Sequence, residues 1–195
     1  MATKEDILEQ LVGEYLSHKG YFIRHNIKYL PDKNHPDFIV KQDSNHSDID
    51  VLALNPNKKG PKRVLAVSCK SWQSGFNPKS ELEAIRNNKK IRGRDAWKGF
   101  RELTKEKWSE AFINVVKEHT GTPCFTYVLA VAKVTGDKRI WENEPAFISA
   151  MKGNPIKIIT FRDMLEDVSK DLNTTLASTE IGRMLQMFKT SGIEI

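Results

Sequence analysis

Two short stretches of the sequence, residues 124–134 (CFTYVLAVAKV) and 156–161 (IKIITF), are apolar almost throughout. Strands that are buried on both faces have this composition, whereas strands with one face in solvent alternate apolar and polar residues. A sheet is covered on both faces when helices pack on each side of it. The sequence therefore predicts an α/β protein with a mixed central sheet flanked by helices.

Two further runs, residues 47–54 (SDIDVLAL) and 62–72 (KRVLAVSCKSW), are also typical of strands. The segment NPNKKGP between them is rich in residues that favour turns, so we expect an antiparallel hairpin. Residues 21–29 predict another strand, and residues 38–40 a short extension of it.

Helices are predicted where apolar residues recur every three to four positions. This spacing occurs in residues 3–17, 162–172 and 178–189. Residues 75–121 show it more sparsely, and we expect helices there that are broken near residues 92–94. This segment would form a basic helical insert within a single domain that spans residues 1–195, because a chain of 195 residues fits one domain.

Several classes of protein are excluded by what the sequence lacks. Cys69 and Cys124 are too few for a disulfide framework, and the histidines and cysteines do not have zinc-ligand spacing. No apolar run reaches membrane-spanning length, and no G-x-x-x-x-G-K-[ST] loop is present. We therefore expect a cytoplasmic protein that does not cross a membrane and is neither a P-loop ATPase nor a kinase.

Positive charge is concentrated in one segment. The chain carries a formal net charge of +6, and residues 79–107 hold ten Lys or Arg against five Asp or Glu. Within it, Lys89, Lys90, Arg92 and Arg94 could follow a phosphate backbone, which would make binding dependent on salt. A solvated helix face is an equally good explanation of such a run. DNA is the partner that we expect first, and RNA stays open.

Four residues with polar side chains share faces of the expected hairpin. Residues two apart in a strand point the same way, so Asp48 and Asp50 share one face, while Ser68 and Lys70 share a face of the next strand. Lys70 at the end of an apolar strand needs solvent or a carboxylate partner, and Asp50 can be that partner. A strand-end salt bridge explains this pair at least as simply as a catalytic site does.

Phosphodiester hydrolysis requires side chains of the same kinds as Asp50 and Lys70. A divalent cation holds the phosphate and lowers the pKa of the attacking water, and a positive side chain offsets charge that develops on phosphorus. Carboxylates bind Mg²⁺, which prefers oxygen ligands. An aspartate on one strand and a lysine on its neighbour supply both functions.

The run D-I-D-V-L-A-L, a turn and V-L-A-V-S-C-K-S-W resembles the core of the PD-(D/E)XK, or restriction-endonuclease-like, nuclease superfamily. The resemblance covers residues 7–72, and residues 156–165 look like the late strand and helix of such domains. It implies that Asp50 is a metal-ligating aspartate and Lys70 the lysine of the motif. The backbone carbonyl of Cys69 would be a further ligand.

The resemblance also implies a catalytic glutamate on the first helix, ahead of a Gly-aromatic pair that opens the first strand. Glu9 precedes Gly20 of the pair Gly20-Tyr21 by 11 residues. Glu9 and Glu14 lie about 140° apart on a helical wheel, so only one of them would face the site, and the spacing favours Glu9. A solvated carboxylate on a helix face is the simpler alternative for Glu9.

Position 68 departs from the motif, because the family usually has Glu or Asp where this chain has Ser68. Serine is a weaker metal ligand and would at most hydrogen-bond a water on the cation. Glu9 could compensate for the missing acid, and Asp48 or Gln73 could contribute. Trp72, on the same face as Lys70, could stack on a base, and Gln73 could also contact nucleic acid.

The sequence thus predicts an endonuclease that depends on Mg²⁺ or Mn²⁺ and hydrolyses DNA, with Glu9, Asp50, Ser68 and Lys70 in its active site. Cutting both strands of a duplex would favour a homodimer. The alternative is a module on the same fold that binds DNA or RNA without cutting it. A third hypothesis is an interaction protein whose basic segment docks an acidic partner. The recognition sequence, the form of the substrate and the pathway stay open.

Overall fold

The computed structural model describes residues 6–91, 93–172, 177 and 179–193. Its main sheet has five strands in the order β1-β2-β3-β6-β7. The first three strands pair antiparallel, whereas β3, β6 and β7 pair parallel, so the sheet is mixed as expected. The strands are β1 (Phe22–Tyr29), β2 (Ser47–Leu54), β3 (Val64–Lys70), β6 (Thr126–Val131) and β7 (Ile156–Thr160).

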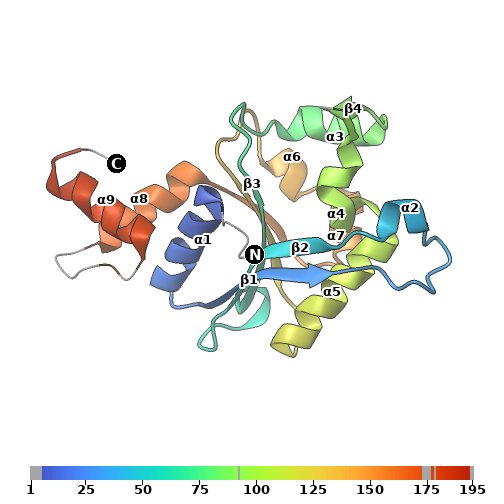
Figure 1. Ribbon diagram of the computed structural model, residues 1–195, viewed down its shortest axis with the longest axis horizontal. Helices are drawn as coiled ribbons and strands as arrows, with labels where there is room; N and C mark the ends of the chain where they lie inside the picture. Colours follow the sequence, from blue (N-terminus) through green and yellow to red (C-terminus); the bar gives the residue numbers. More distant parts are fainter. Residues whose placement is uncertain (1–5, 92, 173–176, 178, 194–195) are drawn as a thin grey trace.

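Helices cover both faces of this sheet (Figure 1). One face carries α1 (Ile7–His18), α8 (Phe161–Asp171) and α9 (Glu180–Thr190). On the other face lie α3 (Pro78–Arg86), α4 (Arg101–Thr104), α5 (Glu106–Thr120), α6 (Arg139–Glu142) and α7 (Pro145–Ala150). The predicted α/β class is therefore confirmed, as are the helices expected at residues 3–17, 162–172 and 178–189, whose described parts are α1, α8 and α9. No helix in the described ranges is long and apolar enough to span a membrane.

The sheet separates two hydrophobic cores. The larger core lies under α5, and the smaller core under α1, α8 and α9. Tyr127 and Leu129 of β6 enter the larger core, while Val128 and Ala130 enter the smaller one, which explains why this strand is apolar throughout. Residues 156–161 also pack on both faces, because Ile156 and Ile158 of β7 enter the larger core and Ile159 packs against the smaller one, although β7 is an edge strand and exposes Lys157.

Strands β2 and β3 separate before β3 ends. Their pairing stops at Val51–Val67, so Asp50 lies where the two strands diverge. Opposite Asp50 on β1, Asn26 has a left-handed φ of 55°, a conformation that asparagine tolerates well. Ile49 packs in the larger core and Val51 in the smaller, so the regular alternation predicted for this strand breaks at Asp50. This break opens space beside the end of β3.

The strand extension predicted at residues 38–40 is wrong, because the chain turns there into a short helix, α2 (Val40–Asp43). The buried Asp43 carboxylate accepts hydrogen bonds from the Ile39 N–H at 2.8 Å and from Trp108 Nε1 at 3.0 Å. It also pairs with Lys107 Nζ at 2.5 Å. These contacts anchor α2 to α5.

The basic segment is helical as expected, but its break is a small hairpin rather than a loop. Strands β4 (Lys90–Ile91) and β5 (Arg94–Asp95) pair antiparallel and lead into a 3₁₀ helix, η2 (Ala96–Phe100). Arg92 lies outside the described residues. The following helix α5 contributes Trp108 and Phe112 to the larger core, so this part of the segment belongs to the body of the fold.

Candidate active site

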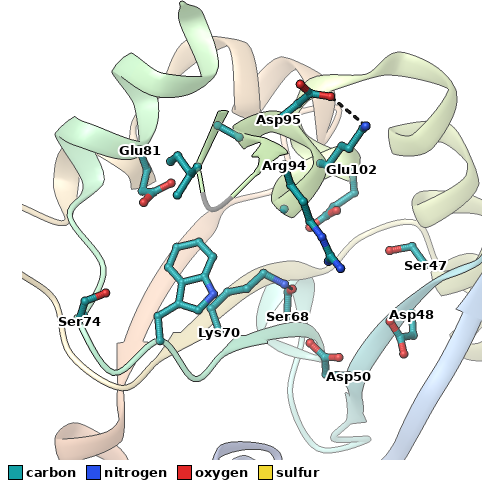
Figure 2. Close-up of a pocket in the computed structure, with 16 residues that line it drawn as sticks. Ser47, Asp48, Asp50, Ser68, Lys70, Ser74, Glu81, Arg94, Asp95 and Glu102 are labelled. Atoms are coloured by element: carbon teal, nitrogen blue, oxygen red, sulfur yellow. Dashed lines mark hydrogen bonds and ion pairs between the residues drawn. The ribbon is translucent and has the colours of Figure 1, made fainter. Parts of the chain in front are cut away.

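A cavity of about 650 Å³ opens beside the end of β3, where β2 and β3 separate. Side chains from both strands form its floor, and residues of the β4–β5 hairpin and of α4 close it from above (Figure 2). Its charged lining residues are Asp48, Asp50, Lys70, Glu81, Arg94, Asp95, Lys98 and Glu102. The cavity therefore brings together three residues that the sequence singled out as one site, Asp50, Ser68 and Lys70.

Asp50 fills the gap between the separating strands. Its Oδ2 accepts a hydrogen bond from the Cys69 N–H at 2.5 Å, so β3 holds the carboxylate that β2 provides. Burial raises the pKa of Asp50 to about 6, and Asp48 and Glu102 add to this, although Lys70 and the Cys69 amide act in the opposite direction. A carboxylate that is buried beside other acids is one whose charge a bound cation would stabilise.

Lys70, the last residue of β3, extends along the cavity wall. Its Nζ donates a hydrogen bond to Ser68 Oγ at 3.0 Å and lies 6.0 Å from the centre of the Phe100 ring. The Lys70 charge favours ionisation of Asp50, as the predicted pair requires. The hydrogen bond of Lys70, however, goes to Ser68, because the strands have already separated at Asp50.

Glu9 approaches Asp50 from the α1 side of the sheet and does not line the cavity. Its side chain is partly buried, and this burial together with the charge of Asp50 raises its pKa to about 7. The charges of the two carboxylates therefore repel each other, and a role of Glu9 in the site stays a prediction. Glu14, the alternative on this helix, is buried elsewhere and accepts hydrogen bonds from His18 and Thr179.

Cys69 lies between Lys70 and Ser68 but faces the smaller core. Burial, together with the neighbouring charges of Asp50 and Glu9, raises the pKa of its thiol, so the thiolate is disfavoured. The side chain packs as a small apolar group against the smaller core, whereas the backbone amide holds Asp50. Ligation of a cation by its carbonyl stays a prediction.

Two of the residues proposed to contact nucleic acid line the cavity. Arg94 is exposed, and its guanidinium points down toward the floor of the cavity (Figure 2). Trp72 packs edge-on against Phe100, with ring centroids 5.9 Å apart. It is half-buried, so one part of the ring packs while another faces the cavity.

The remaining residues of that set lie away from the cavity lining. Lys89 and Lys90 are exposed at the start of the β4–β5 hairpin, where a polyanion that extends beyond the cavity could contact them. Gln73 is exposed and donates a hydrogen bond to the Ser71 carbonyl at 3.4 Å. Arg92 lies outside the described residues. Asp48, the additional acid that the sequence suggested, is exposed and lines the cavity.

Glu102 is a buried lining residue that sequence reasoning missed, as it also missed Glu81, Asp95 and Lys98. It is buried on α4, where Oε1 accepts a hydrogen bond from Tyr127 at 2.6 Å and Oε2 one from Tyr29 at 3.5 Å. Its position 34 residues after Ser68 in a charged segment carries no motif. A Glu followed directly by an apolar Leu103 in a sparse helical pattern is typical of many surface helices, so no sequence signal distinguished it.

The donor set of the cavity suits a hard divalent cation. Five of its charged lining residues are acids and three are bases, although the chain as a whole has a net charge of +6. Among the described residues, no group of three His, Cys, Asp or Glu side chains is arranged to hold a metal ion. Mg²⁺ is often bound by one or two carboxylates together with substrate phosphates, so Asp50 and its neighbours fit this mode better than a closed protein site.

Comparison of the chain with protein family models, curated proteins and solved structures found no significant match. The function of the cavity is therefore inferred from its own residues.

Proposed function

We propose that the protein is an endonuclease that hydrolyses DNA phosphodiester bonds with Mg²⁺ or Mn²⁺ as cofactor. The observation that supports this most is the cavity at the end of β3, which holds Asp50, Lys70 and Arg94 together. This reaction needs a carboxylate that binds the cation and positively charged side chains that contact the phosphate. The resemblance of residues 7–72 to restriction-endonuclease-like nucleases points the same way.

Each residue would have a distinct role. A bound cation would polarise the scissile phosphate and favour ionisation of the attacking water. Asp50 and the Cys69 carbonyl would hold the cation, and Glu9 would contribute negative charge from the α1 side. Lys70 would stabilise charge that develops on the phosphate, and Ser68 would orient Lys70.

In this proposal the basic β4–β5 hairpin binds the DNA substrate. Lys89 and Lys90 would contact the DNA backbone beyond the cavity, while Arg94 would contact the phosphate inside it. Cleavage of both strands of a duplex would require two copies of the site, which favours a homodimer. The described cysteines, Cys69 and Cys124, are both free, in keeping with a reducing cytoplasm.

Nicking of supercoiled plasmid at low salt tests the proposal. The wild-type protein should nick the plasmid with Mg²⁺ or Mn²⁺ and not with EDTA, and both Asp50→Ala and Lys70→Ala should abolish nicking. Equal nicking by wild type and both variants would assign the activity to another site or to a contaminant.

A second candidate function is binding of DNA or RNA without cleavage. It is favoured by Ser68 at the motif position and by the lack of three grouped metal-ligating side chains among the described residues. A protein of this kind would never nick plasmid, and its affinity in gel shifts would fall with salt but would not respond to EDTA.

A further inference from the structure

The candidate cavity is covered on two opposite sides. Asp50 and Lys70 lie on its floor, and Arg94 and Asp95 lie on the side that faces them (Figure 2). A sphere of the same volume, about 650 Å³, would be about 11 Å across, whereas the major groove of a DNA duplex alone is about 12 Å wide. Pockets of about 300–1,000 Å³ hold drug-sized ligands, and a nucleotide is of that size. The cavity therefore has room for one DNA strand and not for a paired duplex.

The upper side of the cavity is anchored to the core of the protein. Ala96 and Phe100 of η2 expose only 7% and 0% of their surface. The Ala96 N–H donates a hydrogen bond to the Lys89 carbonyl at 2.9 Å, and Lys98 Nζ pairs with Asp95 at 2.9 Å. Lifting this side far enough to admit a duplex would disrupt these contacts.

Trp72 supplies an aromatic surface inside the cavity. Its ring packs edge-on against Phe100 and tilted against Phe76, with ring centroids 5.9 Å and 6.2 Å apart. Both phenylalanines are buried and hold the ring in one orientation, while Trp72 itself is half-buried and lines the cavity. A ring held in this way can stack on a nucleobase. In a duplex the neighbouring base pairs already cover both faces of each nucleobase, so only an unpaired one can reach Trp72.

The charge of the lining also favours a single strand. Five of the charged lining residues are acids and three are basic. A duplex carries one negative charge per about 1.7 Å of its axis, and each of its strands carries half of that charge. One strand alone therefore meets less repulsion from the acids of the lining than a duplex does.

We infer that the site binds unpaired DNA, so that one strand enters the cavity and a nucleobase stacks on Trp72 beside Asp50 and Lys70. Single-stranded DNA enters directly, whereas a nucleotide of a duplex must first be unpaired and turned out of the stack. This inference rests on the proposed function, since it names the form of DNA that the same site takes.

Cleavage of one plasmid in two topological forms tests the inference. Negative supercoiling favours local unpairing, whereas a relaxed closed circle of the same sequence stays paired. With Mg²⁺ or Mn²⁺ we expect the supercoiled form to be nicked at least about 10-fold faster, because the relaxed form must be unpaired by the protein. Equal rates on the two forms would overturn the inference and leave the proposed nuclease intact.

Oligonucleotide duplexes locate the cut. A duplex with a central mismatched bubble should be cut within the bubble, and a fully paired duplex of the same length should resist. Cutting of the paired duplex at the rate of the bubble would contradict the inference, again without removing the nuclease activity.

Trp72→Leu tests the stacking surface, since leucine keeps an apolar side chain against Phe76 and Phe100. Stacking of a nucleobase on an aromatic ring changes affinity about 5- to 150-fold, and we expect a rise of KM for single-stranded DNA in this range. Trp72→Phe keeps a ring and should retain most of the affinity. Trp97→Leu is the matched control, because Trp97 is also half-buried but lies outside the cavity lining. Equal effects of Trp72→Leu and Trp97→Leu on KM would contradict the role of Trp72.

Binding in EDTA decides the inference without any cleavage. Fluorescence anisotropy of a labelled oligo(dT) strand at low salt is measured with competing unlabelled oligo(dT) or the paired oligo(dT)·oligo(dA) duplex. We expect the strand to bind at least about 10-fold more tightly than the duplex, and Trp72→Leu to weaken binding of the strand alone. If the wild type cuts neither plasmid form, the proposed function fails, and this measurement still tests the site. Equal affinity for strand and duplex, or no effect of Trp72→Leu, would overturn the inference.

Discussion

Asp50 is a carboxylate in a place that disfavours its charge. Its pKa in the folded protein is about 6, above its usual value of 3.8, chiefly because it is buried. The folded protein therefore binds a proton more tightly than the unfolded chain does. The resulting stability is fully present below pH about 4 and is lost as the pH rises through about 6. At neutral pH the site without a cation is thus a source of instability.

Replacing this acid should stabilise the protein when no cation is bound. We expect Asp50→Asn to raise the free energy of unfolding in EDTA at pH 8 by about 1–2 kcal/mol, since a shift of one pKa unit corresponds to about 1.4 kcal/mol and the amide accepts a weaker hydrogen bond from Cys69. Near pH 4 the difference should vanish. Urea unfolding at both pH values measures this, and a less stable variant at pH 8 would contradict the assigned environment.

The central residues of the site were predictable, and their supporting residues were not. Strand alternation and the motif resemblance placed Asp50 and Lys70 on facing strands, and the structure brings both into one cavity. Glu102 reaches this cavity only because α4 packs over the larger core beside Tyr127. Such a contact depends on tertiary packing and leaves no periodic signal in the sequence.

Among the structural elements, apolar composition predicted the strands and helices that build the cores. The β4–β5 hairpin was missed because two-residue strands are too short to show a period of two. Residues 38–40 predict a strand because all three are apolar, but Ile39 is the N-cap of α2 and Val40 is its first residue. The buried partner that decides its conformation, Lys107, is distant in the sequence.

The contact between α2 and α5 should contribute substantially to stability. Lys107 and Asp43 expose only 8% and 1% of their side chains, so removing one partner leaves the other charge buried and unpaired. We expect Asp43→Asn to lower the free energy of unfolding by about 3 kcal/mol.

Asp137 provides the comparison, since it pairs with Arg139 at 2.8 Å on the surface. Asp137→Asn should cost far less than Asp43→Asn, because solvent screens this exposed pair. Chemical denaturation of both variants is the measurement. Similar losses in the two would mean that Asp43 is not the anchor of α2.

The β4–β5 hairpin should carry part of the affinity for DNA. If Lys89 and Lys90 each contact a phosphate, replacing both by Ala should lower affinity and reduce the slope of log K against log salt by about 2. Arg162→Ala on α8, an exposed charge on the opposite face of the sheet, is the control. Binding titrations at several salt concentrations measure the slopes. An unchanged slope for the lysine variant would remove the hairpin from the interface.

For the molecule as a whole, the mixed sheet explains where the site lies. Its antiparallel half ends pairing at Val51–Val67, while its parallel half continues to Lys70, and the cavity lies between them. The chain has a formal net charge of +6, whereas the lining of its cavity is richer in acids than in basic residues. A basic protein with an acidic cavity is suited to hold a polyanion through a cation. The sequence predicted the sheet and the positive charge. It did not predict the cavity, because the cavity depends on the order in which the strands pair.

Nicking of supercoiled plasmid by Asp50→Asn and Asp48→Asn, side by side with Mg²⁺, tests the central claim most directly. The two acids are two residues apart on β2 and line the same cavity, but only Asp50 is held by the Cys69 amide at the strand gap. We predict that Asp50→Asn loses at least about 1,000-fold in rate, whereas Asp48→Asn loses no more than about 10-fold. Full activity of Asp50→Asn would contradict the assignment of this cavity as a nuclease site.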